Sequence, residues 1–212
     1  LKTTGDLVLC CETYSLNSQL RPKKMKLEQV PALLRDLGIP GIAWDDIYFE
    51  SWDKADLDKL KKAAADAGVR TMGLIMEGNL ATPDDTARAG QIEENKMKLR
   101  AARELGAPVV RVNLGNTGKN DENATAGVDR CIAAFKEMLP LARELGVKIT
   151  IENHGGPSKT ADGILRIIRG TDPKWVGSCL DYGNWPPEPP ELRYEEIAKL
   201  APHAFHTHVK AT

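Results

Sequence analysis

Short apolar stretches alternate with longer amphipathic stretches along the whole chain. The apolar stretches are typical of strands and begin near residues 7, 41, 69, 109, 147, 175 and 204. Between each pair lies a segment whose apolar residues recur every three or four positions, which predicts one helix in each gap. Strict alternation of apolar strands with helices favours a parallel sheet that is covered by helices.

Turn and capping residues mark the ends of these elements. Asp53 and Thr160 are predicted helix N-caps, and Gly38, Gly68 and Gly146 are predicted helix stops. The predicted strands span residues 6–15, 41–47, 69–76, 109–114, 147–152, 175–181 and 204–209. The predicted helices span residues 27–37, 53–68, 82–106, 124–145, 160–168 and 194–200.

Two α/β folds fit this order, a doubly wound sheet and a (β/α)8 barrel. A doubly wound sheet usually carries a glycine fingerprint after its first strand, and neither GxGxxG nor a P-loop is present here. Seven regular units fit a TIM barrel of about 250 residues that has been shortened. We therefore predict one TIM-barrel domain over residues 1–212, truncated after about seven βα units and lacking its strand-eight region.

Composition narrows the class of protein. The chain has 212 residues, of which 42% are hydrophobic, enough for one sizeable core. The 29 basic and 30 acidic side chains nearly cancel, so we expect no nucleic-acid partner. No apolar run approaches the ~20 residues that span a membrane, so we expect no membrane partner. The four cysteines form no CxxC pair, which favours a reducing compartment, and we expect a cytoplasmic protein unless an export signal was lost upstream.

Polar side chains end three consecutive predicted strands. Glu152 ends a strand in which polar and aliphatic residues alternate, Asp181 ends the next, and His208 ends the last. In a barrel the active site lies at the carboxyl ends of the strands, so we expect these side chains to converge. Two carboxylates and an imidazole suit a divalent Mn, Mg, Co or Zn ion.

Further candidates lie close to these strand ends or on other strands. His154 follows in a glycine-rich loop and either contacts a substrate hydroxyl or is a surface residue. Arg111 either points into the site or forms an interior ion pair, and Lys210 contacts substrate or a carboxylate. Trp44 either covers the apolar face of a sugar or packs in the core. His206 shares a face with the last strand's terminal His, and an interior histidine is favoured over a ligand.

Several motifs carry a resemblance to a known family. They are Glu-Thr-Tyr-Ser (12–15), Trp-Asp-Asp-Ile-Tyr-Phe-Glu (44–50), Ile-Glu-Asn-His (151–154), Cys-Leu-Asp-Tyr-Gly-Asn (179–184) and His-Thr-His-Val-Lys (206–210). Together they resemble the xylose isomerase-like TIM-barrel superfamily, and within it the sugar phosphate isomerase/epimerase group. The resemblance covers nearly the whole chain and is more specific for fold and metal site than for substrate.

The resemblance implies one divalent metal ion held by Glu, Asp, His and a second Glu. Carried over, Glu152, Asp181 and His208 are the expected ligands, and the second Glu would lie beyond Thr212. Many relatives have His three residues after the Asp, where this chain has Asn184. Asn hydrogen-bonds a sugar hydroxyl but is a poor base, which argues against a second metal or a basic group at that position.

These observations predict a metal-dependent carbohydrate isomerase or epimerase that moves a proton next to a carbonyl through an enediolate. Glu152 is the candidate base, and the partner is a small sugar or sugar derivative; a homo-oligomer is compatible with the sequence. The alternatives are a keto-inositol dehydratase-type lyase and a non-catalytic sugar-binding barrel. A DNA-repair endonuclease-like barrel is disfavoured, because its metal cluster needs several more histidines than the four present.

Overall fold

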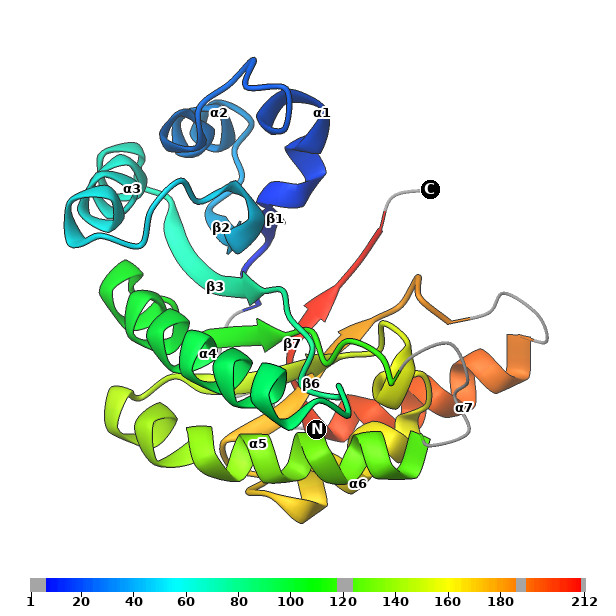
Figure 1. The fold of residues 1–212 in the computed structure, drawn as a ribbon. Coiled ribbons are helices and arrows are strands. Elements are labelled where there is room, and N and C mark those ends of the chain that lie inside the picture. Colours follow the sequence, from blue (N-terminus) through cyan, green and yellow to red (C-terminus); the bar gives the residue numbers. More distant parts are fainter. Residues whose placement is uncertain (1–6, 118–123, 186–189, 211–212) are drawn as a thin grey trace. The chain divides into compact units, whose positions relative to one another are not determined.

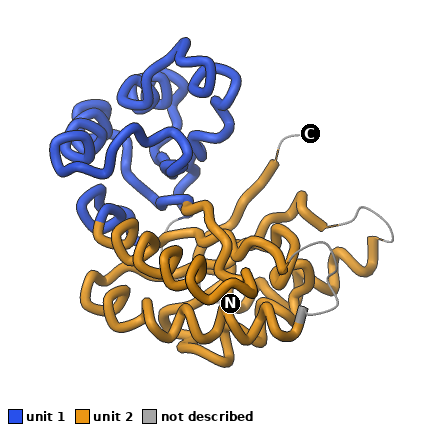
Figure 2. The backbone as a smooth tube through the Cα atoms, in the orientation of Figure 1, with its two compact units in different colours: residues 1–75, 101–108 blue, residues 76–100, 109–212 orange. Residues whose placement is uncertain are grey.

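The computed structural model describes residues 7–117, 124–185 and 190–210, and the chain divides into two compact units (Figure 2). Unit 1 comprises residues 1–75 and 101–108, and unit 2 comprises residues 76–100 and 109–212. The sequence predicts one barrel domain over residues 1–212. That single-domain organisation stays a prediction. Among the described residues, no helix combines the length and the apolar character that a membrane crossing requires.

Unit 1 is built on parallel strands (Figure 1). The strands are β1 (Cys10–Glu12), β2 (Gly41–Asp45) and β3 (Arg70–Met76), whose last residue belongs to unit 2, and β2 pairs with both of the others. The helices are α1 (Asn17–Leu20), α2 (Val30–Asp36) and α3 (Lys54–Ala67). Helix α3 ends at Gly68, whose φ of 67° is a left-handed conformation that glycine adopts without strain.

The first strand is shorter than the sequence predicts. The predicted strand covered residues 6–15, of which Asp6 lies outside the described residues. Only Cys10–Glu12 pair with β2, and the chain then turns into a 3-10 helix over Thr13–Leu16. Leu7 is 95% exposed and Leu9 is 69% exposed, so this apolar run is not the buried strand that its composition predicts. A strand also needs a neighbouring strand for its backbone hydrogen bonds, and apolar composition does not show where that neighbour lies.

Unit 2 contains the other strands, all in parallel pairs (Figure 1). They are β4 (Val109–Val112), β5 (Lys148–Glu152), β6 (Val176–Asp181) and β7 (Ala204–His208). The helices are α5 (Ala124–Leu145), α6 (Ala161–Gly170) and α7 (Pro190–Leu200), and α4 (Asp85–Leu105) begins in this unit and ends in unit 1. Chain order and strand order agree, and the βα alternation of a TIM barrel is confirmed.

Helix α6 packs against both α5 and α7; α5 also packs against strand β5, and α6 and α7 pack against β6. The N-terminus of α6 is capped twice. Thr160 accepts a hydrogen bond from the backbone N–H of Gly163, and the buried Glu196 of α7 accepts one from the N–H of Ala161. These contacts hold α6 and α7 together beside the strands whose ends carry the polar residues.

Candidate metal centre

The carboxyl ends of β5, β6 and β7 bring the three predicted ligands together. Asp181 and His208 are register partners across β6 and β7, and Glu152 lies opposite Cys179 on the neighbouring pair. One donor atom from each of Glu152, Asp181 and His208 lies within 4.8 Å of the others. Their convergence follows from the parallel sheet, because equivalent strand ends meet at one edge. Their role as metal ligands stays a prediction.

Glu152 lies at the centre of this cluster and is 4% exposed. Its Oε2 accepts hydrogen bonds from Arg111, with 2.7 Å to Nε, and its Oε1 accepts one from Nδ2 of Asn184 at 3.1 Å. Nδ1 of His208 is also 3.1 Å from Oε1. Burial raises the pKa of Glu152, but the His208 hydrogen bond and the Arg111 charge outweigh it and hold the pKa well below its ordinary value. Glu152 is therefore an anion at neutral pH.

Arg111 of β4 is buried between two carboxylates. Besides Glu152, it forms a close ion pair with Oε1 of Glu77, which directly follows β3. Burial lowers the pKa of Arg111, and the two carboxylates more than compensate, so the pKa is raised and the guanidinium stays charged. Asn113 donates from Nδ2 to Oε2 of Glu77 at 2.6 Å. Arg111 thus forms an interior ion pair, and because its partner is Glu152 it also lies in the candidate site; its contact with substrate stays a prediction.

The sequence left Glu77 without a role, although it has the same signal as Glu152. Both are acids at the carboxyl end of an apolar strand. The neighbouring buried Lys98 donates from Nζ to the backbone carbonyl of Glu77 at 3.2 Å. Glu77 thus belongs to the charged group around Arg111.

Asp181 is fully buried and held by backbone groups. Its Oδ1 accepts from the N–H of Gly183 at 2.6 Å and of Asn184 at 3.0 Å. The side chain of Asn153 pairs with the backbone of Asp181 in both directions, at 2.9 and 2.8 Å. Oδ2 lies 3.0 Å from Nζ of Lys210 and forms an ion pair with it. Among the described residues, no group donates a hydrogen bond to Oδ2. Oδ2 is therefore the more available oxygen of the two.

Asn184 and Lys210 connect the two carboxylates. Asn184 donates to Glu152 and accepts a close hydrogen bond from Nζ of Lys210, whose side chain is 49% exposed. The structure thus brings both residues to the cluster, at its solvent side. Substrate binding by Asn184 and Lys210 stays a prediction.

Two predicted substrate contacts, His154 and Trp44, have other hydrogen-bond partners. His154 is exposed, and its backbone N–H donates to Oγ of Ser158 at 3.2 Å. Trp44 belongs to unit 1, is fully buried and donates from Nε1 to Oγ1 of Thr71 at 3.1 Å. Their substrate roles stay predictions.

His206 lies one rung below His208 on β7. Its ring meets the ring of His208 edge-on, with centroids 5.2 Å apart. Burial, followed by the neighbouring His208, lowers the pKa of His206 to about 4, so the imidazole is neutral at pH 7. One donor atom each of Cys179, His206 and His208 also lies within 4.8 Å of the others.

The residues present fit a divalent ion. Donor atoms bound at about 2.0–2.2 Å to one ion lie roughly 3 Å apart, so small side-chain shifts would bring the three donors onto an ion. Glu152 is ionised, and Oδ2 of Asp181 is buried and accepts no hydrogen bond from the described residues. Three acids, Glu77, Glu152 and Asp181, face the two positive charges of Arg111 and Lys210, and a cation would offset the excess negative charge.

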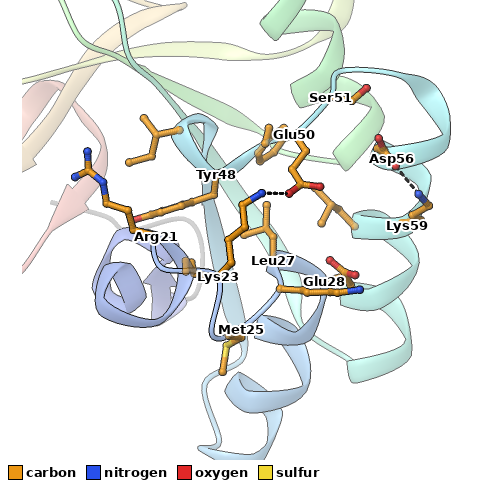
Figure 3. A pocket seen from close by; sticks show the side chains of 15 residues that line it. Arg21, Lys23, Met25, Leu27, Glu28, Tyr48, Glu50, Ser51, Asp56 and Lys59 are labelled. Carbon is orange, nitrogen blue, oxygen red and sulfur yellow. Dashed lines mark hydrogen bonds and ion pairs between the residues drawn. The ribbon is translucent and has the colours of Figure 1, made fainter.

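Unit 1 contains a pocket of about 650 Å³ that includes none of the predicted site residues (Figure 3). Apolar side chains such as Leu27 and Leu60 share its wall with charged groups. Among the charged groups, Lys23 pairs with Glu50 and Lys59 with Asp56 at distances of 2.8 and 2.5 Å. These ion pairs are open to solvent, unlike the cluster around Glu152.

Comparison with known families identifies the class of this protein. Residues 31–212 match the family described as xylose isomerase-like TIM barrel, which confirms the predicted resemblance. The chain belongs to this family. No curated protein sequence matches the chain significantly.

Solved structures show the same fold at low sequence identity. A putative xylose isomerase from Rhodospirillum rubrum has a TM-score of 0.81 at 14% identity, with 98% of this chain and 78% of that chain covered. D-psicose 3-epimerase, solved with D-fructose, has a TM-score of 0.74 at 18% identity, with 87% and 68% covered. The probable 3-DHS dehydratase AsbF from Bacillus anthracis has a TM-score of 0.71 at 14% identity, with 95% and 72% covered. At such identities the likeness shows the fold alone.

Proposed function

We propose that the protein is a divalent-metal-dependent carbohydrate isomerase or epimerase that transfers a proton next to a carbonyl. The observation that carries the proposal is the convergence of Glu152, Asp181 and His208 at one edge of a parallel sheet. Family membership and the likeness to an epimerase support the same class. A bound divalent ion would supply positive charge to the carbonyl and hydroxyl oxygens of a sugar, which stabilises an enediolate.

The chain's own residues would share three tasks. Asp181 and Glu152 provide the negative charge that holds the cation, and backbone N–H groups keep Asp181 oriented. Asn184 and Lys210 lie at the solvent side, where they would contact sugar hydroxyl groups. His154, which is exposed, remains a candidate for the outer part of the sugar site.

Proton removal needs a base, and Glu152 is the candidate. A base works best when its pKa is close to the working pH, whereas Arg111 and His208 depress the pKa of Glu152. We therefore propose that Glu152 acts mainly as a metal ligand and only secondarily as the base that removes the proton. A substrate that loosens the Arg111 contact would raise the basicity of Glu152.

The test is solvent-proton exchange in heavy water. Ketoses and keto-sugars are incubated with the manganese-loaded protein, and deuterium at the carbon beside the carbonyl is followed by NMR. We expect deuterium incorporation that stops when the metal is chelated. Glu152→Gln and Asp181→Asn should abolish exchange, and bound manganese, measured independently, should fall as well because few ligands hold the ion.

Glu196→Gln is the matched control, because Glu196 is also a buried acid of unit 2 but caps α6. It should keep both exchange and metal. Full exchange in Glu152→Gln would remove Glu152 from the mechanism, and unchanged metal content in Asp181→Asn would refute the ligand set. Loss of water from the substrate would instead identify a lyase. Sugar binding without exchange would identify a binding barrel.

A further inference from the structure

Strands β6 and β7 carry two consecutive rungs of metal-binding side chains. In the upper rung Asp181 pairs with His208, and in the lower rung Cys179 pairs with His206. Residues two apart on a strand project from the same face, so Cys179 lies below Asp181 and His206 lies below His208. The lower rung adds a sulfur donor and a second imidazole next to the carboxylate-rich cluster.

These donors are close together and partly or fully buried. Cys179 is fully buried, and one donor atom each of Cys179, His206 and His208 lies within 4.8 Å of the others. Tetrahedral zinc, with ligands at about 2.0–2.3 Å, holds its donors roughly 3.5 Å apart, so the side chains need to move by only about an ångström. The His206 and His208 rings meet edge-on, and a nitrogen of each lies within 4.8 Å of the other.

The hydrogen bond of His208 favours one of its two nitrogens for this purpose. An ionised carboxylate only accepts hydrogen bonds, so the 3.1 Å contact with Oε1 of Glu152 places the proton of His208 on Nδ1. The lone pair is then on Nε2. A carboxylate that holds the N–H of a histidine is the usual outer partner of a metal-binding imidazole, and Glu152 has this position relative to His208.

We propose that Cys179, His206 and His208 form a second metal site, which favours thiolate-preferring ions such as Cd²⁺ and Zn²⁺ over Mn²⁺ and Mg²⁺, with Co²⁺ as a spectroscopic probe of the thiolate. A thiolate with two imidazoles prefers softer ions, whereas the Glu152, Asp181 and His208 set prefers harder ions. The thiol of Cys179 loses its proton to solvent when the ion binds. The site itself does not depend on the isomerase proposal.

Sharing His208 makes the two sets compete. A soft ion at Nε2 keeps the proton on Nδ1 and so retains the hydrogen bond to Glu152. His208 is then not available to the harder ion through Nδ1. This competition, which rests on the proposed hard-ion set, predicts that Cd²⁺ weakens the binding of Mn²⁺.

The test is a Co²⁺ titration of the metal-free, full chain, followed by near-ultraviolet absorption. A cobalt ion bound to a thiolate shows a sulfur-to-cobalt charge-transfer band, which carboxylate and imidazole ligands do not produce. We expect the band in the unmodified protein and its loss in Cys179→Ser. His206→Asn should lower the cobalt affinity by more than about tenfold, since even outer partners of a metal ligand are worth roughly 10- to 100-fold.

Cys131→Ser is the matched control, because Cys131 is another fully buried cysteine but belongs to α5. It should keep the band, as should Asp181→Asn, whose defect is confined to Mn²⁺ binding measured by electron paramagnetic resonance. Absence of the band in the unmodified protein overturns the proposal, whatever the variants do. Persistence of the band in a folded Cys179→Ser overturns it too, as does equal loss in Cys131→Ser. Mn²⁺ binding separately reports on the hard-ion set, so the two proposals fail independently.

Discussion

Ion pairs in the two units have the same chemistry and very different surroundings. Around the pocket of unit 1, Lys23 and Glu50 are 2.8 Å apart, and both side chains are 80% exposed (Figure 3). In unit 2, the side chains of Arg111 and Glu152 are 6% and 3% exposed. Water and salt screen the first pair strongly and the second pair much less.

This difference in burial explains why losing one member of the interior cluster should cost stability, whereas losing one member of an exposed pair should not. An exposed charge that loses its partner is solvated again at almost no cost. A buried carboxylate that loses its partner keeps an uncompensated charge in a poorly solvated interior. The interior cluster is therefore sensitive to each of its members, which is the property expected of a preorganised site.

Breaking the interior pair should have the largest effect on stability. In Arg111→Met, Glu152 and Glu77 lose the guanidinium that separates them. We expect the free energy of unfolding of the metal-free protein to fall by about 3–5 kcal/mol, measured by urea denaturation. The double variant Arg111→Met with Glu152→Gln should recover most of this loss. A loss below about 1 kcal/mol in the single variant would contradict this prediction, because exposed surface pairs contribute that little.

Acid should weaken the same cluster. The folded state depresses the pKa of Glu152 below its ordinary value of 4.5, so the stabilisation is present above that value and is lost as the pH falls toward the folded pKa. Urea midpoints of the metal-free protein measured from about pH 7 to about pH 3 should decline below about pH 4.5. Glu152→Gln should flatten this part of the profile, and an identical slope in the variant would show that other acids cause it.

Glu196 of α7, which caps α6, should have an intermediate effect on stability. The side chain of Glu196 is 10% exposed, and its carboxylate accepts from the N–H of Ala161 at 2.5 Å, at the positive end of α6. Glu196→Ala should cost about 1–2 kcal/mol in urea denaturation. Glu196→Gln keeps an acceptor oxygen and should cost less; equal losses would mean that the charge and not the hydrogen bond matters.

An exposed pair on α3 should show the smallest effect. Lys62 and Asp66 are one helical turn apart, with side chains 73% and 63% exposed. Lys62→Gln keeps a good helix former and should change the free energy of unfolding by less than about 0.5 kcal/mol. Added salt should leave the variant's stability nearer to that of the unmodified protein. A loss above about 1 kcal/mol would contradict the role assigned to exposure.

The sequence by itself determined the elements and the strand ends that carry chemistry. Apolar periodicity predicted α5 over 124–145, as observed, and most of the strands to within a few residues. The family motifs named Glu152, Asp181 and His208, which the structure brings together. These signals are local, because a side chain's face and a strand's end depend on neighbours a few residues away.

Tertiary structure alone decided the partners. It joined Arg111 to both Glu77 and Glu152, placed Cys179 opposite His206, buried Trp44 and limited β1 to three residues. Arg111 and Glu152 are far apart in sequence, and no local pattern encodes which strands meet or in which register. Packing fixes that register, and with it which charges are buried together and which remain in water.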